Sequence, residues 1–182
     1  MRYNRTVTLK DGRTCVIRNG TEKDAKQVLD NFIRTHAQTE FLTTYPDETT
    51  FTVEQEEKYL REKADAEREA ELVAETGGVI AGTAGIDPIR KADKTKHRAS
   101  FGISIDEAWW GLGIGRALTE GCIECAKQAG YLQVELEVVA ANERALSLYR
   151  SAGFTEYGRN PRGFLTRDGR WQEVVLMRLE LG

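Results

Sequence analysis

The glycine-rich run Trp110-Gly111-Leu112-Gly113-Ile114-Gly115-Arg116 has the residue types and spacing best suited to chemistry. It follows the apolar stretch Ile103-Ser104-Ile105 and leads into apolar residues that recur every three or four positions. That order predicts a strand, a tight loop and a helix. Glycines let main-chain N–H groups approach a ligand, and a helix N-terminus adds about half a positive charge. Together they favour a bound phosphate or pyrophosphate, to which Arg116 could add a charge-assisted contact.

Two common phosphate-binding motifs do not match this loop. A Walker loop needs a Gly-Lys-Ser or Gly-Lys-Thr run, which the chain lacks. The dinucleotide fingerprint G-x-G-x-x-G would need its third glycine where Arg116 or Leu118 stands. On spacing alone, a purely structural turn without a ligand remains the alternative.

A second group of residues begins at Asn142, after a strand predicted by the alternation of Val134, Leu136 and Val138. Asn142 is a natural N-cap for a short helix that carries Tyr149. The hydroxyl of Tyr149 could act as an acid, but the ring could equally be part of the core. Both interpretations stay open at this point.

The remaining pattern indicates the elements that position these residues. Asp11-Gly12 is a hairpin turn signal, Thr21 a helix cap, and a Glu-rich helix is expected from about Thr52 to Ala70. Strands, helices and a parallel crossover in this order predict an α+β fold, a mixed α/β sandwich with a mostly antiparallel sheet and helices on both faces. The expected strands are 7–9, 15–18, 72–75, 79–86, 98–105, 134–138, 154–157 and 171–181, and the other expected helices are 21–33, 114–129 and 142–152.

Bulk properties exclude several classes of protein. A length of 182 residues predicts a single domain, 1–182. The net charge of −3 gives no reason to expect DNA as a partner. No apolar run approaches the ~20 residues that span a bilayer, so no membrane partner is expected. Residues 1–5 lack the apolar core of a signal peptide, which makes a cytoplasmic location the default expectation.

Cys122 and Cys125 form a C-x-x-C pair, which raises a metal or redox interpretation. They fall inside a helical pattern with no second pair of Cys or His nearby, and the only other cysteine is Cys15. We therefore expect small apolar filler on a buried helix face, and no metal.

These two motifs, in this order, resemble the GNAT superfamily of acetyl-CoA-dependent N-acetyltransferases. The likeness rests on Trp110-Gly111-Leu112-Gly113-Ile114-Gly115 and on Asn142-x-x-Ala145-x-x-Leu148-Tyr149 followed by Gly153-Phe154. At the motif level it covers roughly residues 100–157. Trp110 stands where the family usually has Arg or Gln, and its Trp-Trp-Gly context is similar to the branch of ribosomal-protein and polyamine N-acetyltransferases.

The resemblance implies a GNAT-like fold and transfer of an acetyl group from acetyl-CoA to a primary amine, by direct attack through a tetrahedral intermediate. It implies that main-chain groups of Ile103 and Ile105 pair with the pantetheine arm and that Asn142 helps to position CoA. Tyr149 would protonate the departing thiolate. The pyrophosphate would be held by main-chain N–H groups of Leu112, Gly113, Ile114, Gly115 and Arg116.

The acceptor is less well defined. From Glu40 to Glu71 there are eleven acidic and four basic residues, a local balance of −7. This suggests a cationic small molecule or a basic peptide N-terminus, although a solvated helix face explains the same charges. The general base stays open among Glu135, Glu137, Tyr45, Asp47 and Glu48. Lys94, Lys96 and Arg98 could meet the nucleotide phosphates of CoA.

Two other functions share parts of this pattern. A non-catalytic CoA-binding or regulatory module would keep Gly113, Gly115 and Asn142 but would not need Tyr149. A dinucleotide oxidoreductase would use Glu135 or Glu137 to bind a ribose, and the missing third glycine counts against it. The oligomeric state is open, with a homodimer as one expectation.

Overall fold

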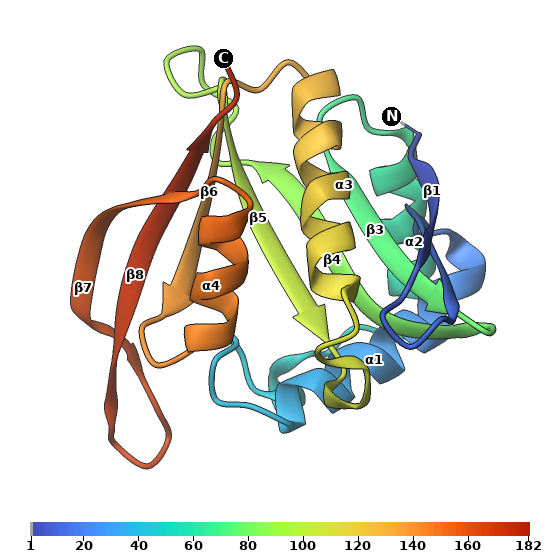
Figure 1. Cartoon of the computed structure of the whole chain (residues 1–182), viewed down its shortest axis with the longest axis horizontal. Coiled ribbons are helices and arrows are strands. Elements are labelled where there is room, and N and C mark those ends of the chain that lie inside the picture. Colours follow the sequence, from blue (N-terminus) through green and yellow to red (C-terminus); the bar gives the residue numbers. More distant parts are fainter. Residues whose placement is uncertain (1) are drawn as a thin grey trace.

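A twisted sheet of eight strands runs through the computed structural model, which describes residues 2–182 (Figure 1). The strand order is β1-β2-β3-β4-β5-β6-β8-β7. Every neighbouring pair is antiparallel except β5 and β6, which are parallel. The strands are β1 (Asn4–Thr8), β2 (Thr14–Asn19), β3 (Ala70–Thr76), β4 (Val79–Pro88), β5 (Arg98–Ile105), β6 (Gln133–Val139), β7 (Thr155–Leu165) and β8 (Trp171–Glu180).

Helices cover both faces of this sheet, as the sequence predicts. Figure 1 shows α3 and α4 on the near face, and α1 and α2 behind the sheet. None of the helices in the described part of the chain is both long and apolar enough to cross a membrane. The helices are α1 (Ala25–Ala37), α2 (Val53–Asp65), α3 (Ile114–Gln128) and α4 (Glu143–Ser151).

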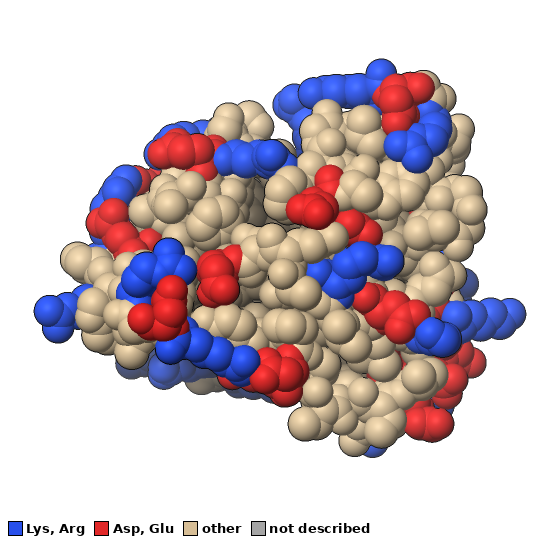
Figure 2. Space-filling view, turned by 90° about the horizontal axis from the view of Figure 1, so that it is seen from below, with Lys and Arg blue, Asp and Glu red and all other residues tan. Residues whose placement is uncertain are grey.

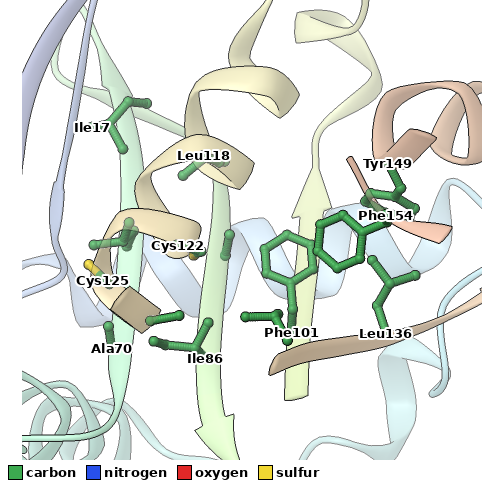
Figure 3. Packing of buried hydrophobic residues seen from close by; sticks show 14 of the residues in the cluster. Ile17, Ala70, Ile86, Phe101, Leu118, Cys122, Cys125, Leu136, Tyr149 and Phe154 are labelled. Atoms are coloured by element: carbon green, nitrogen blue, oxygen red, sulfur yellow. The ribbon is translucent and has the colours of Figure 1, made fainter. Parts of the chain in front are cut away.

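The core lies between α3 and the sheet. Leu118, Cys122 and Cys125 are spaced three or four residues apart, turn toward the sheet and are fully buried (Figure 3). Burial raises the pKa of the Cys125 thiol to about 11, as expected for an inert thiol. This confirms the expectation of apolar filler. Within residues 2–182, no group of three or more His, Cys, Asp or Glu side chains could hold a metal ion.

The sheet opens between its two middle strands. β5 and β6 pair only at Arg98–Ser100 with Gln133–Glu135. Beyond this point β5 stays paired with β4, and β6 stays paired with β8. The rest of the β5 edge therefore has no strand beside it, and the two half-sheets diverge toward the end where α3 begins (Figure 1).

Several element boundaries differ from the sequence prediction, and the largest differences are in the Glu-rich helix and in β7. The Glu-rich helix begins after its Thr52 cap as expected, but α2 ends at Asp65, and Ala70 already belongs to β3. Pairing with β4 overrides the helix propensity of the first β3 residues, Ala70 and Glu71. β7 extends to Leu165 rather than ending near 157, because register shifts accommodate its Gly and Pro residues.

Candidate functional site

The free edge of β5 presents main-chain groups to the gap. At the two ends of the β4–β5 ladder, Asp106 N–H donates to Ala81 O (3.0 Å) and Ile89 N–H donates to Arg98 O (3.2 Å). The main-chain groups of the even-numbered residues of β5 therefore point toward β4. Main-chain groups alternate between the two sides of a strand. Those of Ile103 and Ile105 therefore face the gap, as their predicted role requires.

The glycine loop continues from this edge. Gly113 is the N-cap of α3 with φ +102°, and Gly111 has φ +80°, backbone angles that favour glycine over any other residue. The first helical hydrogen bond runs from Ala117 N–H to Gly113 O (3.1 Å), so the N–H groups of 114–116 have no helical partner. The predicted binding of a phosphate at this helix end needs such N–H groups. The Arg116 side chain lies along α3, 3.0 Å from Glu120, so that only its N–H faces this end.

Neighbouring segments hold the loop in place. Lys10 N–H, in the β1–β2 turn, donates to Leu112 O (3.1 Å). The Trp110 indole donates to Ile105 O (2.8 Å), and the Arg144 guanidinium stacks 4.2 Å from the Trp110 ring centre. One gap-facing carbonyl of β5 is therefore already satisfied by Trp110. Arg144 places a positive charge beside the loop. The sequence analysis did not predict this contact, and the only available signal was that Arg144 lies two residues after Asn142.

Asn142 and Tyr149 lie on the other side of the gap, on α4. The Asn142 side chain caps α4 by accepting from Ala145 N–H (3.2 Å), and Asn142 also lines the central cavity. Tyr149 is buried against Phe101 and Phe154, with ring centres 6.0 and 5.9 Å away (Figure 3). It lines the same cavity, and burial raises the pKa of its hydroxyl, which is therefore protonated at neutral pH.

A cavity of about 980 Å³ passes through the gap between the half-sheets. It is bounded by Tyr149 on the α4 side and by α1, the 41–51 segment and α2 on the opposite side. The surface seen from the end that carries the glycine loop is hollowed between two halves (Figure 2). Much of the cavity wall is apolar: Val28, Leu29, Phe32, Phe41, Leu42, Phe51, Ile89 and Phe164.

The charges in this cavity are negative. Among the described residues that line it, none is Lys or Arg, and His36 has its pKa lowered by burial. Two of its carboxylates pair with cations outside the lining: Glu135 with Arg98, and Asp87 with Lys63. The carboxylates that line the cavity are Glu48, Glu56, Glu71, Asp87, Glu135 and Glu137.

The proposed general bases occupy different surroundings. Arg98 lowers the pKa of Glu135, so this carboxylate is a weak base. Glu137 lines the cavity and is exposed. Tyr45 and Asp47 contact Arg167 in the β7–β8 turn instead, through Tyr45 Oη to Arg167 N–H (2.9 Å) and an ion pair of 2.8 Å.

Glu71 lines the cavity floor, and the sequence analysis did not single it out. Burial raises the pKa of its carboxyl to about 7. The available signal was that Glu71 directly precedes the apolar run Leu72-Val73-Ala74, but the sequence analysis counted it only as part of the acidic segment.

The basic stretch 90–98 lies away from the glycine loop. It precedes β5, whereas the loop follows it (Figure 1). Eight residues of strand separate the two by about 23 Å. Arg98 pairs with Glu135, and Lys96 pairs with Asp93. The idea that these side chains meet phosphates bound at the loop is therefore wrong.

Comparison with known proteins agrees with this geometry. The family model described as "Acetyltransferase (GNAT) family" matches residues 32–154. An L-amino acid N-acyltransferase of Escherichia coli (strain K12) is 29% identical over 110 residues, 60% of this chain and 63% of that protein. The [ribosomal protein bS18]-alanine N-acetyltransferase of the same strain is 36% identical over 81 residues, 44% of this chain and 54% of that protein. The match thus spans less than two thirds of either relative.

Solved structures share the fold over nearly the whole chain. A GNAT-family acetyltransferase from Streptococcus pneumoniae has a TM-score of 0.87 and 28% identity, covering 92% of this chain and 99% of that one. A putative acetyltransferase from Salmonella typhimurium, solved with acetyl-CoA, has a TM-score of 0.82 and 21% identity, covering 92% and 94%.

Proposed function

The chain belongs to the GNAT acetyltransferase family, and from that premise we propose that it transfers an acetyl group from acetyl-CoA to the primary amine of a cationic, partly apolar acceptor. The observation that carries the proposal is the cavity between the half-sheets. It joins the free edge of β5, which leads into the glycine loop, to a compartment lined by carboxylates and aromatic rings. The proposal treats residues 1–182 as one catalytic domain, because one sheet contains both the first and the last strand.

The site fits acetyl-CoA through main-chain groups. The gap-facing N–H and C=O groups of Ile103 and the N–H of Ile105 suit an extended amide-containing arm, which would lie beside β5 like an added strand. The N–H groups of 114–116 suit the pyrophosphate. Arg144 adds a charge-assisted contact at the same end, and Asn142 fixes the start of α4 beside the gap.

Tyr149 is proposed as the acid that protonates the departing sulfur. Its raised pKa keeps the hydroxyl protonated at neutral pH, and its position on the cavity wall lets it donate to the departing sulfur. Burial also excludes water from the ring, which strengthens the electrostatic interaction with a developing negative charge.

The acceptor is proposed to be cationic because the cavity has carboxylates and no Lys or Arg among its described lining residues. Its aromatic wall favours an apolar group next to the ammonium. A substrate with a carboxylate beside its amine would meet like charge there, so free amino acids are expected to be poorer acceptors than amines or peptide N-termini.

The test has two stages. The melting temperature is first measured with and without acetyl-CoA, with NAD as control. A ligand at ~100 times its Kd stabilises a fold by about 2.7 kcal/mol. Release of free CoA thiol is then followed with 2-phenylethylamine, spermidine, L-phenylalanine and an alanyl peptide. We expect a melting shift with acetyl-CoA alone and faster turnover of 2-phenylethylamine than of L-phenylalanine. A missing acetyl-CoA shift contradicts the cofactor, and the reverse order of acceptors contradicts the acceptor class.

A further inference from the structure

Glu71 lies beside two glycines, which leave part of the sheet surface without side chains. The register aligns Glu71 of β3 with Gly85 of β4, and Gly85 with Gly102 of β5. These positions share the face covered by α1 and α2, because partners in a ladder point to the same side. The two glycines therefore leave a trough that leads from Glu71 to the free edge of β5.

The carboxylate of Glu71 fills one end of this trough. A Cβ at Gly85 would overlap Glu71 Oε2, so the carboxylate lies directly over β4. A Cβ at Gly102 would have nothing within 4 Å, so the trough over β5 is open. Adjacent strands are about 4.8 Å apart. The space between the carboxylate and the β5 edge therefore accommodates an amine nitrogen or one water molecule.

We propose that Glu71 is the general base of the reaction and takes a proton from the acceptor amine in the trough formed by Gly85 and Gly102. This assignment rests on the proposed function. An acceptor reaching this trough from the α1–α2 side would place its nitrogen beside the β5 edge, where the thioester is proposed to lie.

The chemistry balances with the residues present. The acceptor enters as an ammonium ion and gives one proton to Glu71. The nitrogen lone pair forms the C–N bond to the thioester carbonyl carbon, and the C–S bond breaks as the carbonyl re-forms. Tyr149 gives its proton to the sulfur and regains one from the new amide nitrogen. Glu71 releases its proton to solvent, so the net products are the amide, the thiol and one proton.

The surroundings suit a base that works near neutral pH. Burial raises the pKa of Glu71 to about 7, and the neighbouring Thr83 side chain on β4 lowers it. A carboxylate with a pKa near the working pH is an efficient proton acceptor. Lys63 on α2 lowers this pKa, whereas Asp87 on β4 and Glu56 on α2 raise it. The other titratable groups that interact with Glu71 are Tyr59 on α2 and Cys122 on α3.

The first test compares Glu71→Gln with Glu67→Gln, an exposed carboxylate four residues earlier. With 2-phenylethylamine, wild type and Glu67→Gln are expected to lose kcat/KM below about pH 7. Glu71→Gln is expected to lose about 100-fold in kcat at pH 7.5 and to keep the acetyl-CoA melting shift. Its rate would then rise about tenfold per pH unit toward the pKa of the amine, about 10. A Glu71→Gln enzyme with wild-type kcat and an unchanged acid limb would overturn the proposal.

A second variant tests the trough without altering the carboxylate. Gly102→Ala adds a methyl group to open space, so folding is expected to be unaffected. We expect a raised KM for the amine and an unchanged acetyl-CoA melting shift. A wild-type KM would show that the acceptor does not occupy the trough, and would contradict the proposal.

A third measurement does not depend on turnover. Calorimetric titration of 2-phenylethylamine at pH 7, in buffers of different ionisation enthalpy and with CoA present, gives the protons released on binding. Ammonium next to Glu71 lowers its pKa, so about half a proton is expected from wild type and none from Glu71→Gln. Equal release from both would overturn the proposal. If the wild type and Glu71→Gln turn over the amine equally well, only this inference is refuted. If acetyl-CoA gives no melting shift, the proposed function is refuted.

Discussion

Replacing Glu71 by Gln should stabilise the protein, and by an amount that grows with pH. The carboxyl has a pKa of about 7 in the folded protein against an ordinary value of 4.5. Because the folded pKa is raised, the protonated carboxyl is favoured in the folded state. Its contribution to stability is fully present below pH 4.5 and is lost as pH rises to about 7.

The magnitude follows from the difference in pKa. Each unit of pKa is worth about 1.4 kcal/mol, so ionised Glu71 costs the folded protein about 3 kcal/mol above pH 7. Gln keeps the shape of the side chain and cannot ionise. The free energy of unfolding of Glu71→Gln, relative to wild type, should therefore rise by about 2 to 3 kcal/mol between pH 5 and pH 8.

Urea unfolding of both proteins at pH 5 and pH 8 measures this difference, provided that their m-values agree. Glu67→Gln serves as the control, since its exposed carboxylate should give the same small effect at both pH values. A gain for Glu71→Gln that is the same at pH 5 and pH 8 would refute the reasoning. It would mean that Glu71 ionises as freely in the folded protein as in water.

Other predictions address the remaining parts of the site. Tyr149→Phe should lower kcat by about 100-fold or more while leaving the Kd of acetyl-CoA unchanged, measured by thiol release and calorimetry; equal turnover would contradict its role as acid. Gly113→Ala, at φ +102°, should lose about 1–2 kcal/mol of stability and most of the acetyl-CoA melting shift, whereas Gly169→Ala, at φ +85°, should lose stability alone. Leu60→Ala removes a fully buried side chain between α2 and the sheet, and urea unfolding should show a loss of about 2–5 kcal/mol. For spermidine, kcat/KM should fall as salt rises from 0.05 to about 0.5 M, because exposed charges are screened within a few ångströms; a rate independent of salt would contradict a cationic acceptor.

Local signals were sufficient for most of the fold. The Asp11-Gly12 turn, the Thr52 cap and the glycines of the α3 loop each act within a few residues, and each is found where the sequence predicts it. The strand Arg98–Ile105 even has the predicted bounds. Such features depend on backbone angles and local hydrogen bonds, which residue types encode directly.

Features that depend on pairing between distant segments could not be predicted in this way. Glu71 becomes a distinctive carboxylate only because Gly85 lies beside it on the next strand. Glu135 was a reasonable candidate base by alternation, but the sequence does not reveal that Arg98 neutralises it. The stacking of Arg144 on Trp110 likewise depends on how α4 faces the glycine loop.

The split sheet also separates two kinds of recognition that would otherwise constrain each other. The proposed acetyl-CoA contacts come largely from main-chain groups of β5 and α3, which most substitutions leave unchanged provided that the glycines remain. The acceptor compartment is instead lined by side chains of α1, the 41–51 segment and α2. Directed evolution aimed at the latter should therefore change the choice of amine while the affinity for acetyl-CoA persists. Proteins that share this split sheet can therefore evolve toward different acceptor amines while they keep the same contacts to the acetyl donor.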